Sequence, residues 1–171
     1  MTADAGPALP QGLTVEVVRA AEGWASETDL SGLAEAAVAA ACAVIRFEAP
    51  QSSDLAVLFA DDAHVRDLNA RFRGKDKSTN VLSFPGDMDG GGPEATHLGD
   101  IVLAYETVAA EAKDEDKPFD HHLAHLVVHG FLHVIGYDHE DAVMAEEMEG
   151  CERAALARLE IPDPYGDAPL A

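Results

Sequence analysis

The sequence has few cysteines, and no long apolar run is obvious in it. Its two cysteines, Cys42 and Cys151, are too few for a disulfide framework and too far apart for a cysteine zinc motif. No apolar run approaches the roughly 20 residues that a membrane span needs, and no charged-then-apolar leader opens the chain. We therefore expect a cytoplasmic protein with reduced thiols and no membrane contact.

Basic residues are also scarce. The chain has 11 Lys and Arg against 32 Asp and Glu, which gives a formal net charge of −21. Such a protein repels nucleic acid at long range, and we expect no DNA partner. Four of the basic residues lie close together, at Arg71, Arg73, Lys75 and Lys77. A polyanion would have to bind at this cluster, although a solvated loop has the same composition.

Length and hydrophobic content predict one domain. The chain has 171 residues, of which 47% are hydrophobic, enough for a single core. Hydrophobic periodicity predicts strands at 13–19, 55–60, 79–84 and 99–104, and helices at 33–45, 106–113, 118–135 and 142–159. A further helix should carry Val65, Leu68 and Phe72. We expect an α/β (α+β) domain with about four strands in a mixed sheet and about five helices. It should span 13–160, after a flexible arm at 1–12 and before an irregular tail at 161–171.

Helix ends are suggested by capping residues. Asp29 or Ser31 could cap the Ala-rich helix at 33–45, Asp61 and Asp62 could supply the cap of the next helix, and Asp141 could cap the last. Gly74 should end the second helix, because glycine readily adopts the left-handed conformation.

The most informative segment contains His129, His133 and His139. Two histidines four residues apart lie on one face of a helix and can reach the same metal ion. A third ligand four residues further along the helix is missing, because that position is Tyr137. Gly136 can instead end the helix in a left-handed conformation and let the chain fold back. The pattern therefore predicts a metal site at a helix end and the turn that follows.

Three imidazole ligands leave one position of a tetrahedral zinc ion open, as in catalytic zinc sites. The same ligands would also accept nickel, cobalt or copper. His125, one turn before His129, could support a ligand, face the substrate or simply pack in the core. We expect His121 and His122, at the start of the helix, to be exposed.

The histidine spacing is shared with the metzincin peptidases. In those enzymes the residue after the first histidine is a glutamate that acts as general base. Here that residue is Gly130. Peptide hydrolysis by the metzincin mechanism is therefore not supported.

A closer resemblance covers about residues 54–155. The segment 125–139, HLVVHGFLHVIGYDH, resembles the signature of the YbeY family of bacterial rRNA-maturation endoribonucleases. A second segment at 69–85, NARFRGKDKSTNVLSFP, and Gly99-Asp100-Ile101 resemble other parts of that family. Ser78 departs from the family pattern, where proline is more usual.

The resemblance implies one zinc ion at His129, His133 and His139, and an active role for Arg73 near the metal. It also implies a single-stranded RNA substrate, including the 3′ end of small-subunit rRNA, with a role in ribosome quality control. The planar fork of Arg73 could grip a phosphate, with help from Lys75 and Lys77. An ion pair between Arg73 and a nearby acid such as Asp76 is the alternative.

The general base and the attacking nucleophile stay open at this stage. Asp138, Asp100 and His125 are candidates for the base. Two other functions also remain: a zinc peptidase-like hydrolase with a base from another segment, and a non-catalytic ribosome-associated factor with structural zinc. The acidic composition predicts weak binding to free RNA, so the ribosome or a ribosome-associated protein should deliver the substrate.

Overall fold

The computed structural model describes residues 8–50, 52–86 and 96–165. In chain order the elements are β1 (Leu13–Arg19), α1 (Glu27–Ile45), β2 (Ser53–Ala60), α2 (Asp62–Arg73), β3 (Val81–Pro85), β4 (Thr96–Ala104), α3 (Tyr105–Asp114), α4 (Phe119–Val134) and α5 (Ala142–Arg158). The expected α/β class is confirmed. Most of the predicted arm, 1–7, and most of the predicted tail, 166–171, lie outside the described residues.

The four strands form one mixed sheet in the order β1-β2-β4-β3. β1, β2 and β4 are parallel, whereas β3 pairs antiparallel with β4 at the edge. One row of paired residues crosses the whole sheet, from Val17 through Val57 and Ile101 to Ser83. This row ends beneath helix α4, where the functional site is built.

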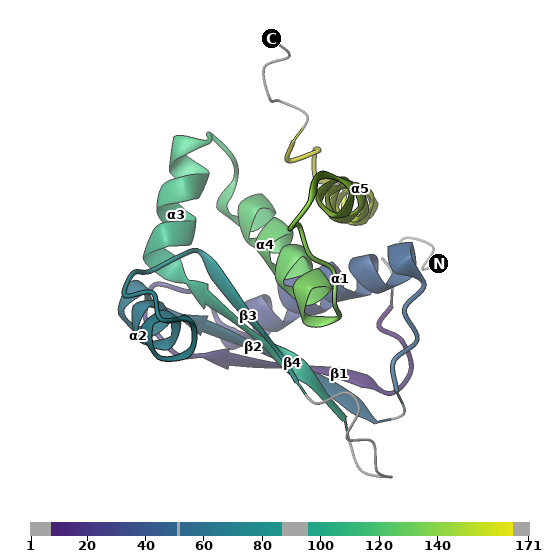
Figure 1. The fold of residues 1–171 in the computed structure, drawn as a ribbon, viewed down its shortest axis with the longest axis horizontal. Helices are drawn as coiled ribbons and strands as arrows, with labels where there is room; N and C mark the ends of the chain where they lie inside the picture. The colour runs from purple at the N-terminus through teal and green to yellow at the C-terminus, as the bar shows by residue number, and fades with distance from the viewer. Residues whose placement is uncertain (1–7, 51, 87–95, 166–171) are drawn as a thin grey trace.

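Helices cover both faces of the sheet (Figure 1). α1 and α4 pack over one face with α5 against both of them, and their core includes Leu55, Val57, Ile101 and Leu103. The alternate residues of β2 and β4 face the other way, as strand geometry requires. There Ala60, Val102 and Ala104 form a smaller cluster with Val65 of α2.

α1 begins earlier than predicted, and its apolar part is longer than expected. It begins at Glu27 because Ser26 is the cap, and the Ser26 hydroxyl accepts the backbone N–H of Asp29 at 3.2 Å. The helix has 19 residues, and an 18-residue window of it has a mean hydropathy of 1.5, so it is long and apolar enough to cross a membrane. The expectation that no such run exists was therefore wrong. α1 nevertheless contacts β1, α4 and α5, and Ala34, Ala37 and Val38 are fully buried there, so it is a core helix of this domain.

Other helix ends agree with the sequence. Asp61 caps α2 and Asp141 caps α5, each accepting a backbone N–H at 2.8 Å. Gly74 ends α2 with a φ of 70°. The two cysteines are free, and burial raises the pKa of Cys42 to about 12, so this thiol stays protonated.

α4 approaches the sheet closely at Gly130. A Cβ atom at this position would lie 2.8 Å from Cγ2 of Ile101 and 3.2 Å from Oγ of Ser83. The Ser83 hydroxyl donates a hydrogen bond to the Gly130 carbonyl at 3.1 Å. Glycine is therefore needed here for packing, and a glutamate could not fit without moving α4 off the sheet.

We expect Gly130→Ala to lower the free energy of unfolding by up to about 2 kcal/mol. Overpacking against buried Ile101 costs roughly 1–3 kcal/mol, and the gain of about 1 kcal/mol in helix propensity offsets part of it. Gly150→Ala in α5 is the matched control, because nothing lies within 4 Å of its added Cβ. The control should gain stability in urea unfolding. Equal stabilisation by both substitutions would contradict the packing argument.

Candidate metal centre

The C-terminal half of α4 places His129 and His133 one turn apart. The helix then ends, and Gly136 has a φ of 113°, in the region that favours glycine. The backbone N–H of Gly136 bonds the His133 carbonyl at 3.1 Å, and that of Tyr137 bonds the Leu132 carbonyl at 2.9 Å. The chain folds back as the sequence predicts.

The three histidine rings lie close together. Ring centroids are 4.6 Å apart for His129 and His133, 5.0 Å for His133 and His139, and 5.9 Å for His129 and His139. Imidazoles around one tetrahedral zinc ion have centroids roughly 5 Å apart, given metal–nitrogen distances of about 2.0–2.1 Å. The centroid spacing is compatible with one shared metal ion, but His129 is not among the residues whose potential ligand atoms all lie within 4.8 Å of one another.

An acidic side chain lies beside two of these rings. The potential ligand atoms of His133, Asp138 and His139 all lie within 4.8 Å of one another. Burial, together with the neighbouring charges of His129 and His139, lowers the pKa of His133. The neutral ring is the form that binds a metal ion.

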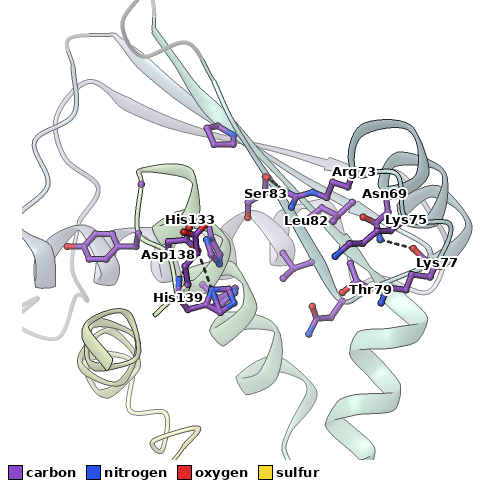
Figure 2. Close-up of a pocket in the computed structure, with 17 residues that line it drawn as sticks. Asn69, Arg73, Lys75, Lys77, Thr79, Leu82, Ser83, His133, Asp138 and His139 are labelled. Carbon is purple, nitrogen blue, oxygen red and sulfur yellow. Dashed lines mark hydrogen bonds and ion pairs between the residues drawn. The ribbon is translucent and has the colours of Figure 1, made fainter. Parts of the chain in front are cut away.

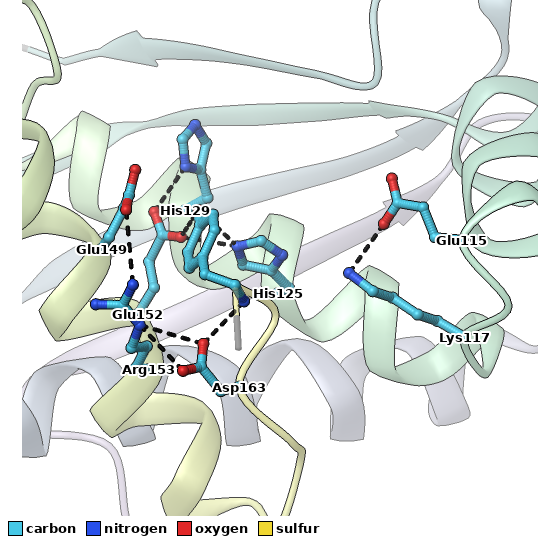
Figure 3. Close-up of polar contacts among 9 residues, drawn as sticks. Glu115, Lys117, His125, His129, Glu149, Glu152, Arg153 and Asp163 are labelled. Atoms are coloured by element: carbon cyan, nitrogen blue, oxygen red, sulfur yellow. Dashed lines mark hydrogen bonds and ion pairs between the residues drawn. The ribbon is translucent and has the colours of Figure 1, made fainter. Parts of the chain in front are cut away.

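Behind the histidines lies Glu152 of α5, whose side chain is 1% exposed. Its carboxylate bonds His129 Nδ1 at 2.8 Å and His125 Nε2 at 2.7 Å, and it accepts the Tyr165 hydroxyl (Figure 3). Burial favours the neutral form of Glu152, but these hydrogen bonds prevail and lower its pKa to about 2.

Sequence reasoning missed Glu152, although one sign of it was present. Glu152 shares a helical face with Met148, Ala155 and Leu156, all of which are buried. A lone carboxylate among apolar residues at helical spacing needs a buried partner. The identity of that partner depends on how α5 docks on α4, which the sequence does not reveal.

Two other histidines of α4 lie outside the main pocket. His125 lines an adjoining cavity of about 450 Å³, which His129 also lines, and the centroids of these two rings are 6.4 Å apart. His122 also lies outside the main pocket. It is 5% exposed, contrary to the expected exposure, and its Nε2 bonds Glu111 at 2.8 Å.

The metal centre forms one wall of a pocket of about 750 Å³. Arg73, Lys75 and Lys77 lie on the opposite wall, as Figure 2 shows. The loop that carries the lysines is held by Asn69, whose side-chain amide donates to the Lys77 carbonyl at 2.9 Å. The pocket therefore joins the predicted metal ligands to the predicted phosphate-binding residues.

Arg73 is held by the backbone rather than by an acid. Its Nη2 donates to the Ser83 carbonyl at 2.7 Å, and its guanidinium lies 5.5 Å from the centroid of the Phe84 ring. The alternative ion pair with Asp76 is not formed, because Asp76 pairs with Arg66 at 2.8 Å. Among the described residues, the other N–H donors of Arg73 have no hydrogen-bond partner, so they can face an anion in the pocket.

Of the two aspartates considered as general base, only Asp138 lines this pocket. Asp100 faces the opposite side of the sheet, where it lines an apolar groove beside α2. It bonds His97 Nε2 at 3.2 Å, and Asp54 bonds Nδ1 of the same ring. Asp100 therefore lies on the face of the sheet opposite the metal centre and cannot act there.

Comparison with known proteins agrees with this arrangement. The sequence model of one family, Endoribonuclease YbeY, matches residues 19–160. The chain belongs to the YbeY family. An Endoribonuclease YbeY of Chelativorans sp. (strain BNC1) is 56% identical over 162 residues, covering 94% of this chain and 98% of that protein. One from Rhodopseudomonas palustris (strain ATCC BAA-98 / CGA009) is 53% identical over 152 residues, covering 88% and 80%.

A solved structure has the same fold. The solution structure of TM1509 from Thermotoga maritima superposes with a TM-score of 0.54 at 22% identity, covering 92% of this chain and 99% of that one. The YbeY family match also extends beyond the segment of resemblance in the sequence, to include α1, the last residue of β1 and the end of α5.

We expect Gly136→Ala to weaken zinc binding roughly tenfold, because a non-glycine residue at this φ costs about 1–3 kcal/mol. The alanine should either keep the strained backbone conformation or relax it, and relaxation would turn His139 away from the other two rings. Competition with a chromophoric chelator measures the affinity. Gly150→Ala, which adds the same methyl group on an exposed face of α5, should bind zinc like the wild type. Unchanged affinity in Gly136→Ala would contradict the proposed turn geometry.

His97 should make stability depend on pH. The hydrogen bond to Asp54 raises the pKa of His97, burial opposes the rise, and Asp100 adds to it. Stabilisation by His97 is therefore fully present below its unfolded pKa of about 6.5 and is lost as pH rises through the higher folded pKa. The stability difference between wild type and His97→Gln should shrink from pH 5.5 to pH 8.5 in urea unfolding. His64→Gln, at an exposed histidine of α2, should show a smaller change.

Proposed function

We propose that this protein is a zinc-dependent endoribonuclease that cleaves single-stranded RNA. Its proposed role is maturation of the 3′ end of small-subunit rRNA and ribosome quality control in the cytoplasm. The observation that carries the proposal is the pocket with three neighbouring histidines on one wall and Arg73, Lys75 and Lys77 on the other. Membership of a family whose relatives are named endoribonucleases supports it.

The proposed metal ligands are His129, His133 and His139. A zinc ion held by these three residues would keep an open coordination position, polarise a phosphoryl oxygen and lower the pKa of bound water. Zinc is proposed over nickel, cobalt or copper because three protein imidazoles with one open position are typical of catalytic zinc.

The proposed task of Arg73 is to bind the scissile phosphate. The Ser83 carbonyl and the Phe84 ring fix its guanidinium, so little side-chain entropy is lost when a phosphate binds. The planar fork can donate two parallel hydrogen bonds to phosphate oxygens and offset charge that develops on them. Lys75 and Lys77 add positive charge along the path of the RNA backbone.

Asp138 is the candidate that best fits a proton acceptor. One of its oxygens accepts the backbone N–H of His139 at 2.7 Å, which orients the carboxylate beside the histidines. A carboxylate there can accept the proton of an attacking hydroxyl group in the pocket. His125 bonds Glu152 and lines the adjoining cavity, so we propose a supporting role for it rather than contact with the reacting atoms.

The net charge of −21 shapes how substrate arrives. A basic pocket on an acidic protein attracts RNA only at short range, because the rest of the surface repels it. We propose that the ribosome or a ribosome-associated protein presents the RNA. Affinity for free RNA should be weak and should fall as salt rises.

The decisive experiment is cleavage of an RNA fragment that spans the 3′ end of small-subunit rRNA, with zinc-loaded protein. Chelator should abolish cleavage, and zinc should restore it. Arg73→Gln should lower kcat/KM by about 10²–10³ while zinc content stays unchanged. Arg71→Gln is the matched control, because Arg71 lies on the same helix and pairs with exposed Asp67. Equal activity of the two variants would contradict the role of Arg73.

The same preparation separates the alternatives. Turnover of a peptide library without turnover of RNA would favour a peptidase-like hydrolase. Gly130 argues against it, since this position packs on the sheet and cannot carry the glutamate base. Zinc binding with no turnover of either substrate would favour a structural metal in a non-catalytic ribosome-associated factor.

A further inference from the structure

Glu152 is the only carboxylate among the described residues that is fully buried. A buried charge contributes little net stability, because the cost of desolvation offsets the attraction to its partners. An apolar residue would complete the face that Glu152 shares with Met148 and Leu156. The position of this carboxylate therefore calls for a reason other than stability of the fold.

The two oxygens of Glu152 contact different histidines of α4. Oε2 lies 2.8 Å from Nδ1 of His129, and Oε1 lies 2.7 Å from Nε2 of His125 (Figure 3). An ionised carboxylate only accepts hydrogen bonds, so both ring nitrogens must carry protons there. A neutral His129 that is protonated at Nδ1 has its lone pair on Nε2, the nitrogen left for a metal ion.

The carboxylate is itself fixed in place from the other side. The Tyr165 hydroxyl donates to Oε1, and the Tyr165 backbone N–H donates to Asp163 at 2.8 Å. Asp163 pairs with Arg153 of α5 at 3.1 Å, and Arg153 also lies over the Tyr165 ring. The segment after α5 is thus tied back onto α5 and closes around Glu152.

We propose that Glu152 is a positioning residue that sets the tautomer and orientation of His129 and so the affinity of the metal centre. Hydrogen bonds from metal-binding histidines to a carboxylate behind them hold the ring and raise its basicity. His125 and Tyr165 donate the other hydrogen bonds, and these hold the Glu152 carboxylate in its orientation toward His129. This inference rests on the proposed metal site of His129, His133 and His139.

The test compares zinc dissociation constants of the full chain and two variants, by competition with a chromophoric chelator. Glu152→Gln should bind zinc about 10–100-fold more weakly. Its single carbonyl oxygen cannot accept from both histidines, and its NH₂ group would face a donor. Glu149→Gln is the matched control, because it removes the same charge from a residue one turn before Glu152. The side chain of Glu149 is half-exposed and pairs with Arg153. Its affinity should equal that of the wild type.

The outcomes separate this inference from the proposed function. Zinc binding by Glu152→Gln within twofold of the wild type would overturn the role of Glu152 and leave the metal site standing. A wild-type protein that binds no zinc would overturn both.

A second measurement uses only the wild type, in case Glu152→Gln does not fold. Nitrogen-15 NMR of the zinc-loaded protein should show His129 protonated at Nδ1 and coordinated through Nε2. Coordination through Nδ1, or a ring without a proton on Nδ1, would overturn the proposal.

Discussion

Ser83 joins the two walls of the pocket, and the geometry of the site depends on it. Its hydroxyl bonds the carbonyl of Gly130 on α4, and its own carbonyl accepts a hydrogen bond from Arg73 on α2. Ser83 is the last residue of the row that crosses the sheet from Val17. The distance between the histidines and the guanidinium is therefore set by a packed sheet rather than by a loop, which suits a site that must place a phosphate accurately.

The two sides of the pocket also differ in electric charge. Acidic residues dominate the chain, yet the wall opposite the histidines carries Arg73, Lys75 and Lys77. The nearest acid in that loop, Asp76, is neutralised by Arg66. Behind the histidines, the buried negative charge of Glu152 is matched by ring and hydroxyl donors. Positive charge thus lines the path proposed for the substrate, and negative charge lies where a cation would be bound.

The sequence predicted well those features that depend only on residues close to one another in the chain. His129, His133 and the turn at Gly136 depend only on helix spacing and on the conformational freedom of glycine, so they could be placed without knowing the fold. What it predicted poorly depends on packing between distant segments. Glu152 finds its partners through the docking of α5 on α4, and Asp100 falls on the wrong face of a sheet whose strand order was unknown. Arg73 came from a family resemblance and not from spacing, since nothing local indicates that α2 approaches α4.

The strand order also governs when the pocket can form on a chain emerging from the ribosome. β3 pairs only with β4 among the described strands, so it has no partner until β4 has been synthesised. α4 then needs β4 beneath Gly130, and Glu152 arrives later still, on α5. During synthesis from the N-terminus, Arg73 lacks the support of the complete sheet until β4 has been made. The histidines of α4 lack the buried carboxylate of Glu152 until nearly the whole domain has been made. The pocket and the buried carboxylate behind it therefore come together only after α5 has been made.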